Sequence, residues 1–136
     1  MKVVINTCLG GFGLSNKAIK KYLELKQIPY WVYEFDYKSR DYKRTNVRNA
    51  LKDDGQDNYT FCIRDLGKRV DKIPNGVGVY SFKLSENRSD EILIKIVEEL
   101  GKDSFGLFSD LKVINLPDNV EYDIEEDRGV EKIIIK

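Results

Sequence analysis

The sequence contains no histidine, and that absence removes several kinds of chemistry at once. Without imidazole there is no Ser–His or Cys–His nucleophilic pair, no histidine-containing zinc site and no imidazole general base. The chain has only two cysteines, Cys8 and Cys62, which are too few for a zinc site made of thiolates. Both lie in apolar, strand-like runs, which favours buried free thiols over a disulfide. We therefore expect no catalytic residue of these classes, no metal site and no cofactor.

An excess of charge and a long apolar run are also missing. The 23 basic and 23 acidic residues give a formal net charge of zero, whereas proteins that bind duplex nucleic acid carry a basic excess. No window approaches the roughly 18 consecutive apolar residues of a membrane span, and residues 1–11 lack the long apolar stretch of a signal peptide. We expect a cytoplasmic protein without a nucleic-acid or membrane partner.

The length of 136 residues and the apolar fraction of 41% are sufficient for one compact core. Helical spacing of apolar residues predicts helices over 16–26, after the N-cap Ser15, and over 90–100, before Gly101. Runs rich in β-branched and aromatic residues predict strands over 2–8, 30–37, 59–64, 77–83, 111–116, 120–125 and 130–135.

These elements predict a single α+β domain over residues 1–136. The first strand, the first helix and the second strand are expected to form a βαβ unit with parallel strands within a mixed sheet. The last two strands are expected to form a C-terminal β-hairpin around the turn at 126–129. The polar segment 38–48 is interpreted as a loop or short helix, and 53–58 as a turn.

The most informative segment is the glycine-rich stretch NTCLGGFGLS at residues 6–15. A glycine turn between a strand and a helix lets a ligand approach the backbone, and the first amides of the helix favour an anion. Phe12 offers a ring face for a base or a sugar. The alternative is that GGFG forms only a tight turn, with Phe12 packed in the core.

CLGGFGLS is also similar to the phosphate loop of the low-molecular-weight tyrosine phosphatases, in which a cysteine is followed by an arginine and a serine. Cys8 and Ser15 match that pattern, but Leu14 stands at the arginine position. Because that arginine holds the phosphate and stabilises its transition state, the segment predicts a cradle without the catalytic machinery.

The charges are unevenly distributed along the chain. Residues 38–48 contain five bases and one acid, a local charge of +4, and they include Tyr42; residues 118–128 contain six acids and one base, a local charge of −5. One interpretation is two solvated faces that pair with each other or across the subunits of a homo-oligomer. The other is a surface for a phosphorylated, base-containing ligand, with Arg40 and Arg44 as additional anion contacts.

Two distant segments carry a family resemblance. KVVINTCLGGFGLSNKAI at the N-terminus, and RSDEILIKIVEELG followed by LKVINLPDNVEYDIEEDRGVEKI, resemble a widespread family of small phage-encoded proteins. The match covers about half of the chain and departs from it at 30–80 and at the C-terminus. Small phage proteins of this type are similar to those that sequester nucleotide immune signals, such as the ADP-ribose derivatives made by bacterial TIR-domain (Thoeris) defence enzymes.

The resemblance implies an anti-defence protein in the cytoplasm of an infected bacterial host. Within the matched segments we expect Arg88, just before the second helix, to reach a phosphate through both arms of its guanidinium. The ligand-binding residues expected from these segments are Asn6, Gly10, Gly11, Phe12, Gly13, Leu14, Ser15 and Arg88.

Three functions therefore remain open. The first, favoured by the lack of a nucleophile–base pair, is non-catalytic capture of a phosphorylated nucleotide of the ADP-ribose or cyclic type. The second is a nucleotide-cleaving enzyme that uses Asp90, Glu125 and Glu126 with a divalent ion. The third is an inhibitor that docks on a host protein through the acidic segment 118–128.

Overall fold

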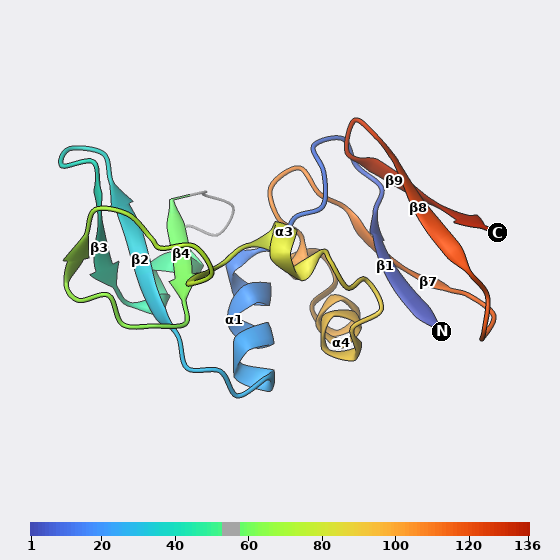
Figure 1. The fold of residues 1–136 in the computed structure, drawn as a ribbon, viewed down its shortest axis with the longest axis horizontal. Helices are drawn as coiled ribbons and strands as arrows, with labels where there is room; N and C mark the ends of the chain where they lie inside the picture. The colour runs from blue at the N-terminus through green and yellow to red at the C-terminus, as the bar shows by residue number, and fades with distance from the viewer. Residues whose placement is uncertain (53–57) are drawn as a thin grey trace.

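In the computed structural model, which describes residues 1–52 and 58–136, strands lie at both ends of the molecule with helices between them (Figure 1). The elements in chain order are β1 (Lys2–Asn6), α1 (Asn16–Leu25), β2 (Trp31–Asp36), β3 (Asp41–Thr45), α2 (Val47–Lys52), β4 (Tyr59–Cys62), β5 (Arg69–Val70), β6 (Gly78–Val79), α3 (Ser81–Leu84), α4 (Glu91–Leu100), the 3-10 helix η1 (Gly101–Ser104), β7 (Leu111–Asn115), β8 (Tyr122–Asp127) and β9 (Val130–Ile135).

One end of the molecule is a five-stranded antiparallel sheet with the order β5-β3-β2-β4-β6. Side chains alternate across a strand, so its two faces build different cores. Val32 and Phe61 belong to the main core with α1 and α4. Tyr33 and Cys62 point to the outer face, which forms a smaller cluster of its own. This sheet therefore has an inner face covered by helices and an outer face on which Tyr33 and Cys62 are buried by side chains such as Leu66 and Ile73.

The other end contains two antiparallel pairs, β1 with β7 and β8 with β9, and also both chain termini (Figure 1). Val3, Ile5 and Leu116 are buried between the pairs. The turn between β8 and β9 consists of Arg128 and Gly129, both with positive φ, as a tight two-residue hairpin requires. The C-terminal hairpin is thus confirmed, and β9 matches the residues expected from the sequence.

Helices α1 and α4 pack between the two sheet regions and form the main core. The Ser15 side chain accepts a hydrogen bond from the Ala18 amide at 3.1 Å, as expected of an N-cap. Asp90 caps α4 in the same way, and Gly101, at φ 53°, ends it. No helix in the described ranges is both long and apolar enough to cross a membrane.

The α+β class is confirmed, but the parallel βαβ unit is wrong. Strand, helix and strand do follow one another, yet β1 pairs antiparallel with β7 and lies in a different sheet from β2. The reason is that β3 and β4 pair with the two edges of β2, so no edge is left for β1. Every strand pair among the described residues is antiparallel.

The middle of the chain also differs from the expectation. The segment 38–48 contains β3 and the start of α2, because the turn at Arg40 (φ 57°) folds the chain back onto β2. The expected strand over 77–83 is only the two-residue β6, followed by α3, and β5 was not expected at all. Of the expected turn at 53–58, residues 53–57 lie outside the described chain.

Candidate functional site

The glycine turn between β1 and α1 is held between two other loops. Gly10 (φ 108°) and Gly11 (φ 95°) adopt left-handed conformations that side chains disfavour. A Cβ on Gly129 of the hairpin turn would overlap the Gly11 amide nitrogen and stand 2.7 Å from that of Gly10. On the other side, the Gly106 amide donates to the Gly13 carbonyl at 3.0 Å. Gly129 is therefore needed for this close backbone contact, and Gly10 and Gly11 for their positive φ, whether or not a ligand binds.

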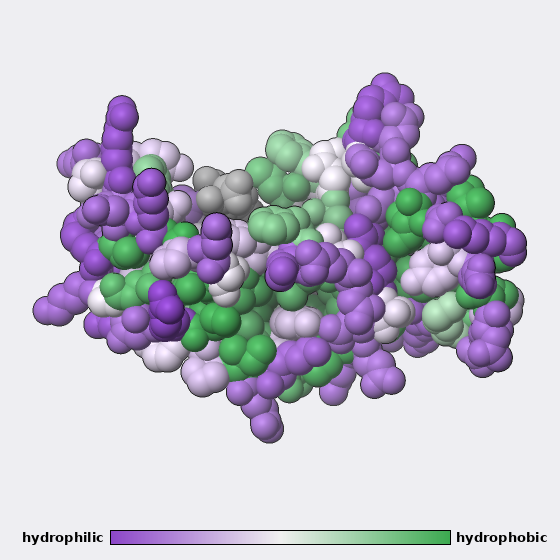
Figure 2. Space-filling model, in the orientation of Figure 1, coloured by the Kyte–Doolittle hydropathy of each residue, from purple (hydrophilic) through white to green (hydrophobic). Residues whose placement is uncertain are grey.

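A cavity of about 420 Å³ opens beside this turn. The turn and the start of α1 form one wall, and Figure 2 shows that apolar surface extends across the middle of the molecule. The lining residues are Phe12, Gly13, Leu14, Ser15, Asn16, Ile19, Tyr59, Val79, Tyr80, Ser81, Gly106, Leu107 and Phe108. Four of the expected site residues, Phe12 to Ser15, are thus brought together at one cavity.

A second hollow of about 390 Å³ adjoins the first along the 106–108 loop and carries positive charge. It shares Ser15 with the first cavity and adds Lys17, Lys102 and Asp103. Lys17 lies 3.6 Å from a carboxylate oxygen of Asp103. An aromatic cavity thus adjoins a hollow lined by two lysines and one aspartate at the N-terminus of α1, where the helix dipole also favours negative charge.

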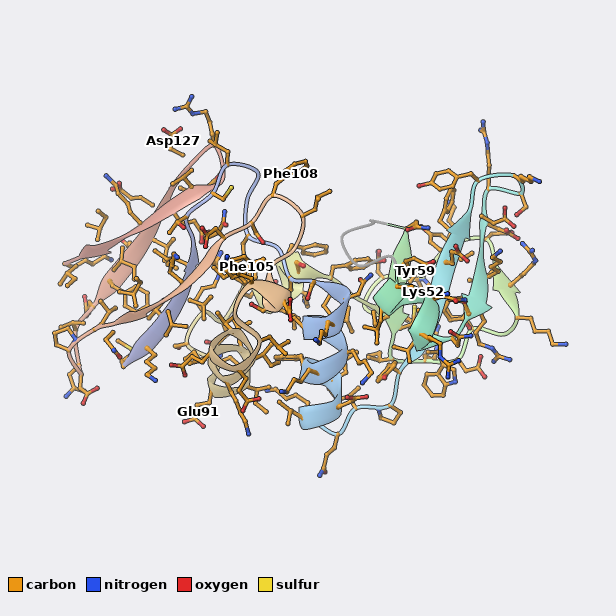
Figure 3. The ribbon with its side chains drawn as sticks, turned by 180° about the vertical axis from the view of Figure 1, so that it is seen from behind. Lys52, Tyr59, Glu91, Phe105, Phe108 and Asp127 are labelled. Carbon is orange, nitrogen blue, oxygen red and sulfur yellow. The ribbon has the colours of Figure 1, made fainter. Side chains whose placement is uncertain are left out.

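Phe108 stands at the mouth of both hollows in a costly conformation. Its φ is 61°, which is rare for an aromatic residue, and its side chain is 70% exposed. Figure 3 shows Phe108 on the tip of its loop, whereas Phe105 lies deeper, beside the helices. An exposed ring kept in a strained turn at a cavity mouth is consistent with a role in binding.

The sequence led us to expect Arg88 at the ligand site, but Arg88 does not line the cavity. Its Nη1 and Nη2 donate to the two carboxylate oxygens of Glu131 at 2.6 and 2.7 Å, and its Nε donates to the Ser85 carbonyl at 2.6 Å. The guanidinium carbon also lies 4.2 Å from the centre of the Phe12 ring. The guanidinium of Arg88 is therefore occupied by protein groups, and it supports the glycine turn through its contact with Phe12.

Asn6 is likewise a structural residue. It is fully buried, and its side-chain amide donates to the carbonyls of Cys8 and Gly129, both at 2.7 Å. Its side-chain oxygen accepts from the Asp110 amide at 2.9 Å. Asn6 thus ties the end of β1 to the hairpin turn and to the start of β7.

Arg40 and Arg44 lie on the five-stranded sheet and do not join this site. Arg44 forms an ion pair with Asp65 at 2.9 Å, and the neighbouring Lys43 lies 3.7 Å from Glu34. In the acidic segment, Glu125 lies near Lys132 of the same hairpin at 3.6 Å. Lys43, Arg44 and Glu125 are thus paired with close neighbours, Arg40 has no ion-pair partner in the described chain, and no ion pair joins the two described patches.

The carboxylates of the expected metal-assisted enzyme serve separate structural roles. Asp90 caps α4, Glu125 pairs within the hairpin, and the Glu126 side chain accepts from the Gly129 amide at 2.7 Å. Among the described residues, no group of three or more histidine, cysteine or acidic side chains is arranged to hold a metal ion.

Both cysteines are free, but only Cys62 is buried as expected. Burial raises the pKa of the Cys62 thiol to about 11. Cys8 lies beyond the end of β1 and is partly exposed, because the strand ends at Asn6, earlier than the sequence indicated.

Sequence reasoning missed Tyr59, Tyr80, Leu107 and Phe108 as cavity residues. The sequence predicts Tyr59 and Tyr80 only as parts of strands, and no local pattern indicates that these two residues lie near the glycine turn. The sequence did contain a signal for the loop around Phe108, because two large apolar residues follow Gly106 outside any expected strand or helix. Comparison with protein-family models, curated protein sequences and solved structures gives no match.

Proposed function

We propose that the protein binds a phosphorylated nucleotide, of the ADP-ribose or cyclic type, without transforming it. The observation that carries the proposal is the aromatic cavity that adjoins a hollow with two lysines and one aspartate at the N-terminus of α1. Tyr59, Tyr80 and Phe108 supply ring surfaces for a base, while Lys17 and Lys102 lie where a phosphate would meet the helix dipole.

The biological setting is part of the same proposal. The glycine turn, which forms one wall of the cavity, lies within the segment that resembles small phage-encoded proteins. We accordingly place the protein in the cytoplasm of an infected bacterial host, where it removes a nucleotide immune signal. Capture without turnover would suffice for that role.

Calorimetry with ADP-ribose and with a cyclic dinucleotide tests the proposal. We expect one of these to bind, and we expect Lys17→Ala to weaken binding about ten-fold through loss of a charge-assisted contact. Lys95→Ala is the matched control, since Lys95 is also an exposed helical lysine with a long ion pair. No binding of either ligand would refute the proposal, and a new chromatographic product after incubation would show an enzyme instead.

A second candidate function is supported by the exposed residues Leu9, Leu107 and Phe108, with exposures of 60%, 60% and 70%. A Cβ on Gly10 would stand 2.8 Å from that of Phe108, so the two loops lie side by side. Such an apolar knob is typical of a protein-binding surface. It suits either an inhibitor of a host protein or a homo-oligomer, and sedimentation of wild type and Leu107→Ser tests the latter.

A further inference from the structure

A different hollow, of about 440 Å³, lies on the five-stranded sheet. It is lined by Phe35, Tyr37, Tyr42, Asn58, Thr60 and Tyr80, none of which carries a charge. Only Tyr80 also lines the cavity beside the glycine turn. Phe35 and Tyr42 are directly opposite each other in the β2–β3 register. Thr60 of β4 is opposite Tyr33, which points to the outer face, and Phe35 is two residues along β2 from Tyr33. The hollow therefore belongs to the outer face of the sheet.

Three of these rings form a contiguous aromatic group. The Phe35 ring lies 4.9 Å from that of Tyr37 at 82°, and 5.2 Å from that of Tyr42 at 68°. Rings that meet edge to face keep other faces available for a further planar ring. Tyr37 is 75% exposed, so the main core does not explain its presence here. Exposed aromatic residues on a sheet are the usual platform on which nucleobases stack.

Asn58 supplies a second, independent observation. Its side-chain oxygen is buried and has no hydrogen-bond partner, and among the described residues it is the one buried side-chain atom of this kind. A buried acceptor without a donor costs free energy that a ligand donor would recover. The amide of asparagine is also the group that reads the exocyclic amine and adjacent ring nitrogen of adenine.

The charges near the rings favour an attached phosphate. Arg69 Nη1 donates to Asp41 at 2.8 Å, and Arg69 Nη2 lies 3.4 Å from Asp36, so both acids flanking the β2–β3 turn are paired. Lys38 and Arg40, within that turn, are exposed and have no ion-pair partner in the described chain. Two cations thus lie within three positions of Tyr37 in the sequence, in the turn at the same end of the sheet.

We propose that this hollow is a second binding site, which takes a nucleobase bearing an exocyclic amine, with Lys38 and Arg40 beside it for the attached phosphate. A methylated ammonium group also fits aromatic rings, but it is disfavoured because no carboxylate lines the hollow and the adjoining turn is basic. The amine and phosphate can come from a free nucleotide or from a single strand, and the experiment separates these sources.

The test compares AMP with IMP, which carries oxygen in place of the exocyclic amine. In calorimetry we expect AMP to bind about ten-fold more tightly than IMP, and Asn58→Ala to reduce AMP to the affinity of IMP. Tyr37→Ala, at a position exposed enough to leave folding intact, is expected to weaken AMP about ten-fold. Equal affinity for AMP and IMP in wild type would overturn the proposal.

Phe108→Ala is the control that separates the two sites, because Phe108 lines only the hollows beside the glycine turn. We expect it to leave AMP binding unchanged. If Phe108→Ala abolishes AMP binding while Tyr37→Ala has no effect, AMP occupies the other cavity and the second site is refuted.

An adenosine tetranucleotide that binds ten-fold more tightly than AMP identifies a single strand as the source, and equal affinity identifies a free nucleotide.

Discussion

The guanidinium of Arg88 and the carboxylate of Glu131 form a two-pronged ion pair across 43 positions of sequence. Both side chains are largely buried, with exposures of 12% and 7%. Glu131 also accepts from the backbone amide of Asn6 at 2.8 Å, so the pair joins β1, β9 and the segment before α4. A buried pair of this kind depends on both partners, since either charge alone would remain in a poorly solvated place.

We expect Arg88→Ala to lower the free energy of unfolding by about 3–5 kcal/mol, because it leaves the Glu131 carboxylate buried without its partner. Urea unfolding measures the change. Arg128→Ala is the control, since Arg128 is 81% exposed, and it should change stability by less than about 0.5 kcal/mol. If Arg88→Ala is as stable as wild type but binds ligand less well, Arg88 contacts the ligand, as the sequence first indicated.

Gly129→Ala is expected to destabilise the protein more than Gly76→Ala. Both glycines have similar positive φ values, 90° and 81°, so alanine brings about the same backbone strain of roughly 1–2 kcal/mol at each. A Cβ at Gly76 meets open space, whereas one at Gly129 collides with the backbone of the glycine turn. That collision should add about 1–3 kcal/mol in thermal or urea unfolding. Equal losses would mean that the hairpin turn does not pack against the glycine turn.

The sequence predicted the features that depend on neighbouring residues and missed those that depend on distant ones. Ser15 and Gly101 act within one helical turn of themselves, so their roles at the helix ends followed from local pattern alone, whereas Asp90, expected as the first residue of its helix, is its N-cap. The partners of β1 and of Arg88 lie more than 40 positions away, and no local pattern specifies them. The same is true of the cavity, whose other walls come from β4 and from the loop containing Phe108.

Stability should fall in acid partly through Asp90. Although burial opposes ionisation, hydrogen bonds from the Ile92 amide and the Tyr22 hydroxyl, with Lys26 nearby, hold the pKa of Asp90 below its usual value. The stabilisation is therefore present above about pH 4 and is lost as the pH falls through the lowered pKa. Asp90→Asn keeps an N-cap but removes the charge, so it should cost about 1–2 kcal/mol at pH 7 and less once the pH has fallen below the lowered pKa. An equal cost at both pH values would contradict this assignment.

Phe108→Gly is expected to separate stability from binding. Glycine adopts φ near 61° without strain, and little packing is lost because the ring is 70% exposed, so the variant should unfold at the same urea concentration as wild type or a higher one. Binding of ADP-ribose or the cyclic dinucleotide should weaken about ten-fold, because the ring at the cavity mouth is gone. Ile135→Ala, which removes another exposed apolar side chain outside this cavity, is the control and should leave binding unchanged. A Phe108→Gly protein that binds as tightly as wild type would show that the strained ring is not part of the site, and the apolar knob would then be better explained as a protein-binding surface.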